Sequence, residues 1–314
     1  MKVLLTGASS FTGVWFAQAL SSAGHQVVAP VRGRRDSYEG VRAERVRVLE
    51  SCAEVVWDCA FGDERFATLA AAGADLLCHH AAQVGDYRSA DFDIAGAVAA
   101  NTRNLRAVLR AMQAAGPCRV LHTGSVFEQD EGAGTLPLRA FSAYGLSKGL
   151  TAQVVAHQAG ELGVAQAKFV IPNPFGPLEE PRFCAYLMRC WKDGRAAEVK
   201  TPAYVRDNIH VGLLAAAYVD LAERLATGTA PGHLGPSGYV EQQGAFTERF
   251  AREMRARTNL ACEVVLPEQA EFGEPMVRIN VDPALPSALA RPLAALGWNE
   301  PAAWDAIAAY YDVR

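Results

Sequence analysis

Short apolar runs alternate with segments of helical periodicity through the first half of the chain. Six strands are predicted by the runs "KVLLT", "HQVVAPV", "EVVWD", "ADLLCHH", "RVLHT" and "AKFVIP". Between them, apolar residues recur about every 3.6 positions, as in "TGVWFAQALSSAG", in one long helix over Ala90–Ala115, and in "SAYGLSKGLTAQVVAHQAGELG". Strand–helix alternation at this spacing predicts right-handed crossovers. We therefore expect an α/β fold with a doubly wound parallel sheet, covered by helices on both faces.

The pattern becomes less regular from about Pro177. Short helices are expected at "FCAYLMRCWKDG" and "QGAFTERFAREMRART", and "PAAWDAIAAYYDVR" closes the chain. One more helix–strand unit is expected at "IHVGLLAAAYVDLAER" and "GHLGPSG". We predict a main unit over residues 1–176, to which 205–237 returns. A smaller C-terminal region then comprises 177–204 and 238–314.

Composition excludes several classes of protein. The 314 residues are 50% hydrophobic and 20% charged, and the net charge of −4 gives no basic footprint for nucleic acid or for an anionic membrane. No apolar run approaches the roughly 20 residues that span a bilayer, and the N-terminus lacks a secretory apolar segment. The seven cysteines are odd in number and include no CxxC pair, so neither a disulfide framework nor a metal site is predicted. These features predict a cytoplasmic protein.

A glycine-rich loop follows the first strand. In a doubly wound sheet, ligands bind beyond the carboxyl ends of the strands. The sequence "TGASSFTG" (6–13) has Gly7 for a tight turn and Gly13 for a close helix–sheet contact, and the helix N-terminus then faces a pyrophosphate. Ser10 stands where the middle glycine of a dinucleotide-binding loop is expected, so a plain strand–turn–helix connection is the alternative. The predicted cofactor contacts in this loop are Gly7, Ser9, Ser10, Phe11, Thr12 and Gly13.

The end of the second strand indicates which dinucleotide is bound. An NAD site usually carries a carboxylate there for the ribose hydroxyls, but this chain has Val31 followed by "RGRRD". Arg32, Arg34 and Arg35 offer charge-assisted hydrogen bonds to a 2′-phosphate. The sequence therefore favours NADP over NAD, with a solvated basic loop as the alternative.

A tyrosine and a lysine four residues apart indicate acid–base chemistry. Tyr144 and Lys148 in "YGLSK" share one face of a predicted helix. A phenol has a reference pKa near 10, and a neighbouring ammonium lowers such a pKa toward the range of acid–base catalysis. The preceding strand ends in "HTGS", so Thr123 or Ser125 could bind a substrate oxygen at the same sheet edge.

Motifs in order along nearly the whole chain resemble those of extended short-chain dehydrogenases/reductases, the nucleotide-sugar epimerase/dehydratase/reductase group. They are "TGASSFTG", "WDCA", "CHHAAQVG", "NTRNL", "LHTGSVFE", "YGLSK", "IPNPFGP", "YVRDNIHV" and "LGW". The resemblance implies a Rossmann domain over 1–176, a substrate-binding C-terminal region and a homodimer. It implies catalytic roles for Thr123, Tyr144 and Lys148. Implied cofactor contacts are Asp58, Cys59, Ala81, Ala82, Asn101, Tyr144, Lys148 and Pro172, and implied substrate contacts are Thr123, Ser125, Asn173 and Arg206.

Departures from the family pattern leave the substrate open. Phe127 replaces a tyrosine, and Gly212 and Leu213 replace acidic residues. The sequence "EFGE" at 271–274 replaces R-x-G-D, so Arg278 or Arg182 is expected to supply the missing substrate arginine. We interpret His79, His80, His122 and His210 as loop or core residues, and Asp207 as a loop cap.

The predicted reaction is NADPH-dependent reduction of a keto group on a nucleotide-linked deoxysugar. Family dehydratases carry Asp-Glu after the catalytic threonine, whereas this chain has Gly124 and Ser125. An NAD-dependent nucleotide-sugar 4-epimerase is the first alternative. A non-catalytic NADP-binding sensor is the second, although such relatives typically lack the tyrosine–lysine pair.

Overall fold

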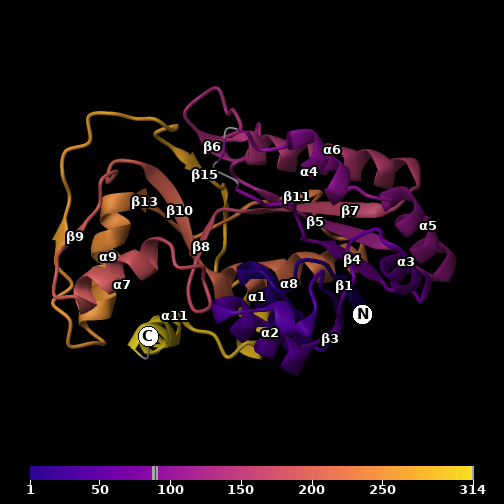
Figure 1. Cartoon of the computed structure of the whole chain (residues 1–314), viewed down its shortest axis with the longest axis horizontal. Helices are drawn as coiled ribbons and strands as arrows, with labels where there is room; N and C mark the ends of the chain where they lie inside the picture. The colour runs from indigo at the N-terminus through magenta and orange to yellow at the C-terminus, as the bar shows by residue number, and fades with distance from the viewer. Residues whose placement is uncertain (87–88, 90, 313–314) are drawn as a thin grey trace.

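Seven parallel strands form the central sheet in the computed structural model, which describes residues 1–86, 89 and 91–312. Their order is β11-β7-β5-β4-β1-β2-β3 (Figure 1), and all six pairings are parallel. The strands are β1 (Lys2–Leu5), β2 (Gln26–Pro30), β3 (Glu54–Val56), β4 (Leu76–His79), β5 (Arg119–Ser125), β7 (Ala165–Ile171) and β11 (His233–Leu234). The strand order reverses between β1 and β4, which confirms the predicted doubly wound sheet and places a ligand crevice there.

Helices cover both faces of this sheet. Figure 1 shows α4 and α6 on one side of the sheet, and α1 and α8 on the other. The first face carries α3 (Glu64–Ala71), α4 (Ile94–Asn101), α5 (Leu105–Ala115) and α6 (Ala143–Glu161). The second carries α1 (Phe11–Ser22), α2 (Gly40–Cys52), α8 (Val211–Thr227) and α10 (Ala290–Ala295). Side chains alternate along each strand, so Val120 packs against the first face and Leu121 against the second.

The long helix predicted over Ala90–Ala115 is wrong, since two helices occupy that stretch; Ala90 itself lies outside the described residues. The break falls at Asn104, which adopts a left-handed conformation with φ of 53°. Its side-chain amide donates to the Gly62 carbonyl at 2.7 Å. This contact with a distant loop stabilises a break that the local apolar periodicity does not show.

Helix α2 was also not predicted, because its sequence lacks a continuous apolar stripe. Arg45 on this helix is fully buried and donates to the Leu178 carbonyl at 2.8 Å and to the Glu180 carboxylate at 2.7 Å. A buried arginine is stable only with such partners, and these come from a loop far away in the sequence.

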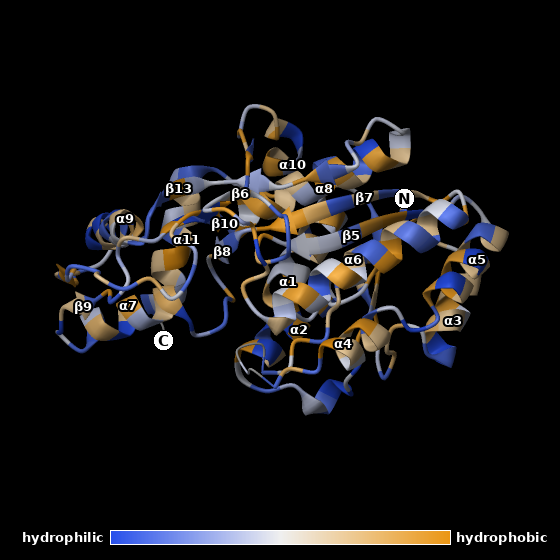
Figure 2. Ribbon diagram, turned by 90° about the horizontal axis from the view of Figure 1, so that it is seen from above, coloured by the Kyte–Doolittle hydropathy of each residue, from blue (hydrophilic) through white to orange (hydrophobic). Residues whose placement is uncertain are grey.

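A second hydrophobic core lies in the C-terminal part of the chain. It is formed by α7 (Phe183–Lys192), α9 (Gln243–Arg255) and α11 (Glu300–Asp312), around Trp191, Phe250 and Trp304. The last two residues of the closing segment "PAAWDAIAAYYDVR", Val313 and Arg314, lie outside the described residues. Figure 2 shows α7, α9 and α11 gathered at one end of the molecule, with α3 and α5 at the other.

Small sheets connect these two parts. Strand β10 (Val205–His210) pairs with β8 (Asn173–Phe175) and with β13 (Tyr239–Gln242) rather than with the central sheet. Within 205–237, therefore, α8 and β11 return to the central sheet and β10 does not. The remaining pairs are β6 (Ala133–Gly134) with β15 (Arg278–Ile279), β9 (Ala197–Glu198) with β14 (Val264–Val265), and β12 (Pro236–Ser237) with β16 (Asp282–Pro283).

A buried carboxyl group joins the second core to the loop after β8. Glu179 is 8% exposed and accepts a hydrogen bond from the Tyr311 hydroxyl on α11. Burial raises the pKa of Glu179 to about 7, because a carboxylate loses its hydration there, while the Tyr311 hydrogen bond opposes the shift. In the described part of the chain, no helix combines the length and apolar character needed to cross a membrane.

Candidate active site

Both glycines of the loop after β1 are required by close backbone contacts. Gly7 has a φ of +72°, and a Cβ there would lie 2.9 Å from the backbone of Ala81. A Cβ on Gly13 would lie 2.2 Å from the Gly7 carbonyl oxygen. The loop therefore passes directly over the turn after β4, and α1 begins at Phe11 with its N-terminus at the sheet crevice. This geometry fits a dinucleotide pyrophosphate.

Thr6 fixes the loop to the turn after β4. Its hydroxyl oxygen accepts hydrogen bonds from the amides of His80 at 3.0 Å and Ala81 at 2.9 Å. Ala81 and Ala82, predicted to lie beside the cofactor, thus flank the glycine loop. The sequence reasoning missed Thr6, although its position directly before Gly7 is a usable signal.

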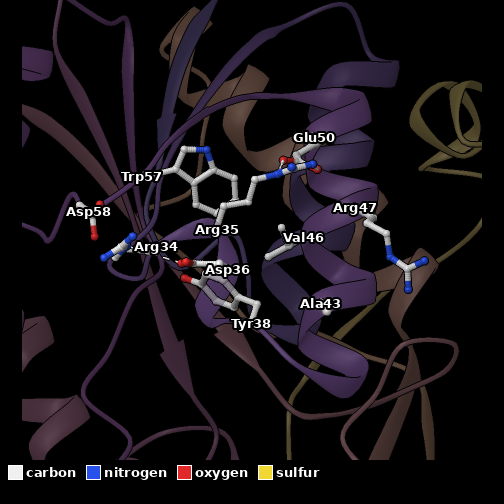
Figure 3. Close-up of a pocket in the computed structure, with 10 residues that line it drawn as sticks. All are labelled: Arg34, Arg35, Asp36, Tyr38, Ala43, Val46, Arg47, Glu50, Trp57 and Asp58. Carbon is white, nitrogen blue, oxygen red and sulfur yellow. Dashed lines mark hydrogen bonds and ion pairs between the residues drawn. The ribbon is translucent and has the colours of Figure 1, made fainter.

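A cavity of about 500 Å³ lies beyond the ends of β2 and β3 (Figure 3). Its lining residues are Arg34, Arg35, Asp36, Tyr38, Ala43, Val46, Arg47, Glu50, Trp57 and Asp58. Figure 3 shows Arg35 reaching toward Glu50, to which it donates two hydrogen bonds of 2.5 and 3.0 Å. Arg34 forms only a loose 3.5 Å ion pair with Asp36 at the surface. Arg47 and Trp57 were not predicted, Arg47 because it lies on the unforeseen helix α2.

Of the three arginines predicted to bind a 2′-phosphate, Arg34 and Arg35 line this cavity and Arg32 does not. The Arg32 guanidinium instead donates to the Gln83 side chain at 3.0 Å, toward the turn after β4. Asp58 and Cys59 lie against the end of β2, since the Asp58 amide donates to Gly33 and the Cys59 amide to Val31. Asp58 and Cys59, predicted to lie near the adenosine of the cofactor, are therefore adjacent to the residues that follow β2.

Asn101 joins three elements around the site. Its side-chain oxygen accepts from the Gln83 amide at 2.7 Å, and its side-chain nitrogen donates to the Thr151 hydroxyl of α6 at 3.2 Å. Its own carbonyl lies 2.9 Å from His79 Nε2. Asn101 thereby holds α4, α6 and the turn after β4 together.

The predicted acid–base pair lies at the start of α6. Ser142 caps this helix by accepting from the Gly145 amide at 3.3 Å. Lys148 is buried, and its ammonium donates to the Thr123 carbonyl at 2.5 Å. Burial lowers the pKa of Lys148, while the nearby Glu128 carboxylate partly opposes this shift. The half-buried Tyr144 presents its ring edge-on to Phe92 at 6.0 Å.

Thr123 meets Lys148 through its backbone. In the sheet Thr123 pairs with Phe169, whose ring lies 5.0 Å from Tyr218 of α8. Paired residues of parallel strands share a face, so the Thr123 side chain is directed to the α8 side of the sheet. Its hydroxyl is buried without a hydrogen-bond partner of good geometry among the described residues. Ser125 is partly exposed, and its hydroxyl oxygen accepts from the Phe127 amide at 3.2 Å.

Two of the arginines predicted to bind the substrate form hydrogen bonds within the protein itself. Arg206 donates to the carbonyls of Val205, Pro275 and Met276 and forms a 3.0 Å ion pair with Glu274. Arg278 is fully buried and donates to the Val126 carbonyl at 2.9 Å and to the Glu128 carbonyl. The Arg278 side chain therefore braces the loop after β5, and its contact with the substrate stays a prediction.

The other predicted substrate residues lie around the loop after β8. Arg182 is the exposed residue just before α7. Asn173 lies in β8 opposite Asn208 of β10, directly after the buried Pro172. Asp207 accepts from the amides of Gly238 and Asn280, as expected of a loop cap, and burial raises its pKa to about 6.

A partly buried charge network, which the sequence did not predict, holds the loop after β5. Lys168 of β7 donates to Glu128 at 2.6 Å and to Glu131, and Glu131 also pairs with His233 of β11 at 2.8 Å. Glu128 is fully buried and accepts from the Ser125 amide at 2.7 Å. The loop that follows Ser125 is therefore tied to β7 and β11. Among the described residues, no cluster of His, Cys, Asp and Glu could hold a metal ion.

Solved structures resemble the chain over its whole length. A mutant UDP-glucuronic acid 4-epimerase from Bacillus cereus, in complex with NAD and UDP-4-deoxy-4-fluoro-glucuronic acid, has a TM-score of 0.73 at 15% identity, covering 100% of this chain and 99% of that chain. A UDP-glucose-4-epimerase from Stenotrophomonas maltophila with bound NAD gives 0.73 at 20% identity, with 100% and 98% covered. A dTDP-glucose 4,6-dehydratase from Streptomyces venezuelae with NAD gives 0.69 at 18% identity, with 100% and 98% covered.

At these identities the structural likeness establishes the fold alone. A search of curated protein sequences finds no significant match. The profile of the NAD dependent epimerase/dehydratase family, however, matches residues 3–234, from β1 through β11 and including the whole of α6. The chain therefore belongs to the NAD-dependent epimerase/dehydratase family, which is a family of extended short-chain dehydrogenase/reductase enzymes.

Proposed function

We propose that the protein reduces a keto group on a nucleotide-linked deoxysugar with NADPH. The observation that carries this proposal is the cavity after β2, where arginines gather and the residue that follows the strand is Val31 instead of a carboxylate. The exposed Arg34–Asp36 pair contributes little to stability, so Arg34 can exchange Asp36 for a phosphate. Tyr144 and Lys148 lie at the start of α6, and Lys148 contacts the carboxyl end of β5, where the reaction would take place.

Each of the site residues has a separate role in such a reduction. When bound, the dinucleotide supplies a hydride for the carbonyl carbon. Tyr144 donates its phenolic proton to the carbonyl oxygen, and the buried Lys148 holds a positive charge beside the reacting groups. Ser125, which is partly exposed at the end of β5, orients that oxygen, whereas the Thr123 hydroxyl is buried toward α8. We propose that residues 177–204 and 238–314 bind the sugar nucleotide, with Asn173, Arg182 and Arg206 on the substrate side.

Cofactor selectivity tests this proposal through binding alone. NADP+ should bind at least tenfold more tightly than NAD+, because one charge-assisted hydrogen bond to a phosphate contributes about 1.5–3 kcal/mol. Arg34→Ala combined with Arg35→Ala should remove the preference. The control is Arg42→Ala, which removes an exposed arginine of α2 that does not line the cavity. Equal affinity of the unmutated protein for both dinucleotides would contradict the NADPH assignment.

A nucleotide-sugar 4-epimerase with bound NAD is the second candidate. It is favoured by the whole-length resemblance to NAD-bound 4-epimerases. The purified protein separates the two candidates. A reductase is isolated largely free of dinucleotide and consumes one NADPH for each 4-keto sugar nucleotide. An epimerase retains NAD on isolation and interconverts two sugar nucleotides with no added cofactor, a result that would replace the first proposal.

We further propose a homodimer through α4 and α6. Between them lies a shallow apolar hollow of about 710 Å³. Its lining residues are Ile94, Ala95, Val98, Ala99, Leu150, Gln153, Val154 and His157. Leu146 and Leu150 on α6 are more than one-third exposed, which suits a contact with a second copy. Light scattering should report a dimer that Leu150→Glu converts to a monomer; a monomeric unmutated protein would refute the proposal.

A further inference from the structure

Side chains close the end of α1 that faces the dinucleotide crevice. Ser10 Oγ accepts a hydrogen bond from the Gly13 amide at 3.1 Å and so caps the helix. The same oxygen lies 3.1 Å from His80 Nε2, and Thr12 Oγ1 also lies 3.1 Å from that nitrogen. Ser10 stands where a dinucleotide-binding loop has its middle glycine, so this cluster replaces open space with hydrogen-bonding groups.

His80 is a fixed partner in this cluster. Its backbone amide donates to Thr6, and its ring packs edge-on against Phe16 of α1 at 5.1 Å. Burial and the nearby charge of Lys148 together lower the pKa of His80 to about 3, so the ring is neutral at physiological pH. With Nε2 as its unprotonated nitrogen, the ring accepts hydrogen bonds from both hydroxyl groups.

The cluster therefore occupies donors that a pyrophosphate would use. The Gly13 amide donates to Ser10 Oγ, and the Ser10 and Thr12 hydroxyl groups donate to His80 in the tautomer whose Nε2 is unprotonated. A phosphate oxygen is only an acceptor, so it gains these donors when the internal hydrogen bonds break. The amides of Phe11 and Thr12, in the first turn, have no acceptor within the helix.

We propose that Ser10, held by His80, is an internal cap that weakens dinucleotide binding and makes the cofactor exchangeable. This inference rests on the proposed function, because a reductase must release its oxidised cofactor in every turnover whereas an epimerase retains it. Ser10 acts here as a determinant of cofactor affinity and exchange. Its effect is shared by NAD and NADP, since both carry the same pyrophosphate.

Dinucleotide binding to Ser10 variants tests the cap. Isothermal titration with NADP+ and with NAD+ would compare the unmutated protein with Ser10→Gly and Ser10→Ala, and stopped-flow would give the dissociation rates. Both variants should bind each dinucleotide about tenfold more tightly, the factor that corresponds to one hydrogen bond of about 1.4 kcal/mol, and should release it more slowly. The matched control is Ser22→Gly, which makes the same change at the far end of α1 and should leave both affinities unchanged.

Each contrary result has a distinct meaning. Unchanged or weaker binding by both Ser10 variants would overturn the cap, because the Ser10 hydroxyl would then be neutral or a phosphate donor. Tighter binding by Ser10→Gly alone would also overturn it, since the obstacle would be the Cβ atom. If the unmutated protein binds neither dinucleotide, the proposed function itself fails. A gain in affinity for NADP+ but not for NAD+ would assign the effect to the arginine cavity and would overturn the proposed role of Ser10.

Discussion

Replacing Glu179 with glutamine should remove a pH dependence from the stability of the protein. Glu179 is buried between the loop after β8 and α11, and its pKa in the folded protein is about 7 against an ordinary value of 4.5. The folded state thus binds this proton more tightly than the unfolded state does. The stabilisation is fully present below pH 4.5 and is lost as the pH rises through about 7.

The size of the effect follows from that difference in pKa. The interval between 4.5 and about 7, at about 1.4 kcal/mol for each pH unit, corresponds to about 3 kcal/mol. Glutamine cannot ionise, and its amide oxygen can still accept from Tyr311. Near pH 5 Glu179→Gln and the unmutated protein should have similar free energies of unfolding. Near pH 9 the variant should be more stable by about 3 kcal/mol.

Urea denaturation at intervals from pH 5 to pH 9 measures this difference directly. The control is Glu161→Gln, which neutralises an exposed carboxylate at the end of α6 and should run parallel to the unmutated protein. If the Glu179→Gln curve also runs parallel throughout, Glu179 ionises normally in the fold and the reasoning from burial is refuted.

Three further substitutions address the site and the core. Tyr144→Phe should lower turnover about 10²–10⁴-fold with dinucleotide affinity retained, and near-normal turnover would show that the proton comes from another group. Gly13→Ala places a Cβ atom 2.2 Å from the Gly7 carbonyl oxygen. It should lower the free energy of unfolding, measured by urea denaturation, by about 1–3 kcal/mol, and an unchanged denaturation midpoint would contradict the contact. Phe169→Ala leaves a cavity at a fully buried position between β7 and α8 and should lower the free energy of unfolding by about 3–5 kcal/mol. A decrease of less than about 1 kcal/mol would show that neighbouring side chains fill the cavity.

Features set by local sequence could be predicted. Each buried strand is a short apolar run, and the turn at Gly7 and Gly13 depends on residues with no Cβ atom. The spacing of Tyr144 and Lys148 puts both on one helix, which is again a local property. The parallel, doubly wound sheet could be predicted because strand–helix alternation requires right-handed crossovers.

Features set by distant contacts could not be predicted. The break at Asn104 depends on a hydrogen bond to Gly62, and α2 is held partly by the contact of Arg45 with the loop after β8. Arg278 had the residue type expected of a substrate contact, yet the carbonyls of the loop after β5 occupy its guanidinium. A motif gives the position of an arginine in the chain, but only the folded structure shows which acceptors reach it.

The charge network around Lys168 has a consequence for how the sheet ends. Strand β11 forms one edge of the central sheet and is only two residues long, and β3 at the opposite edge has three. Exposed edges with free backbone groups can pair with other chains and aggregate. At β11 the ion pair of His233 with Glu131 places charge beside the edge, and Pro231 and Pro236 flank the strand. Although half of its residues are hydrophobic, the protein therefore exposes very few unpaired backbone groups with which the sheet of another molecule could pair.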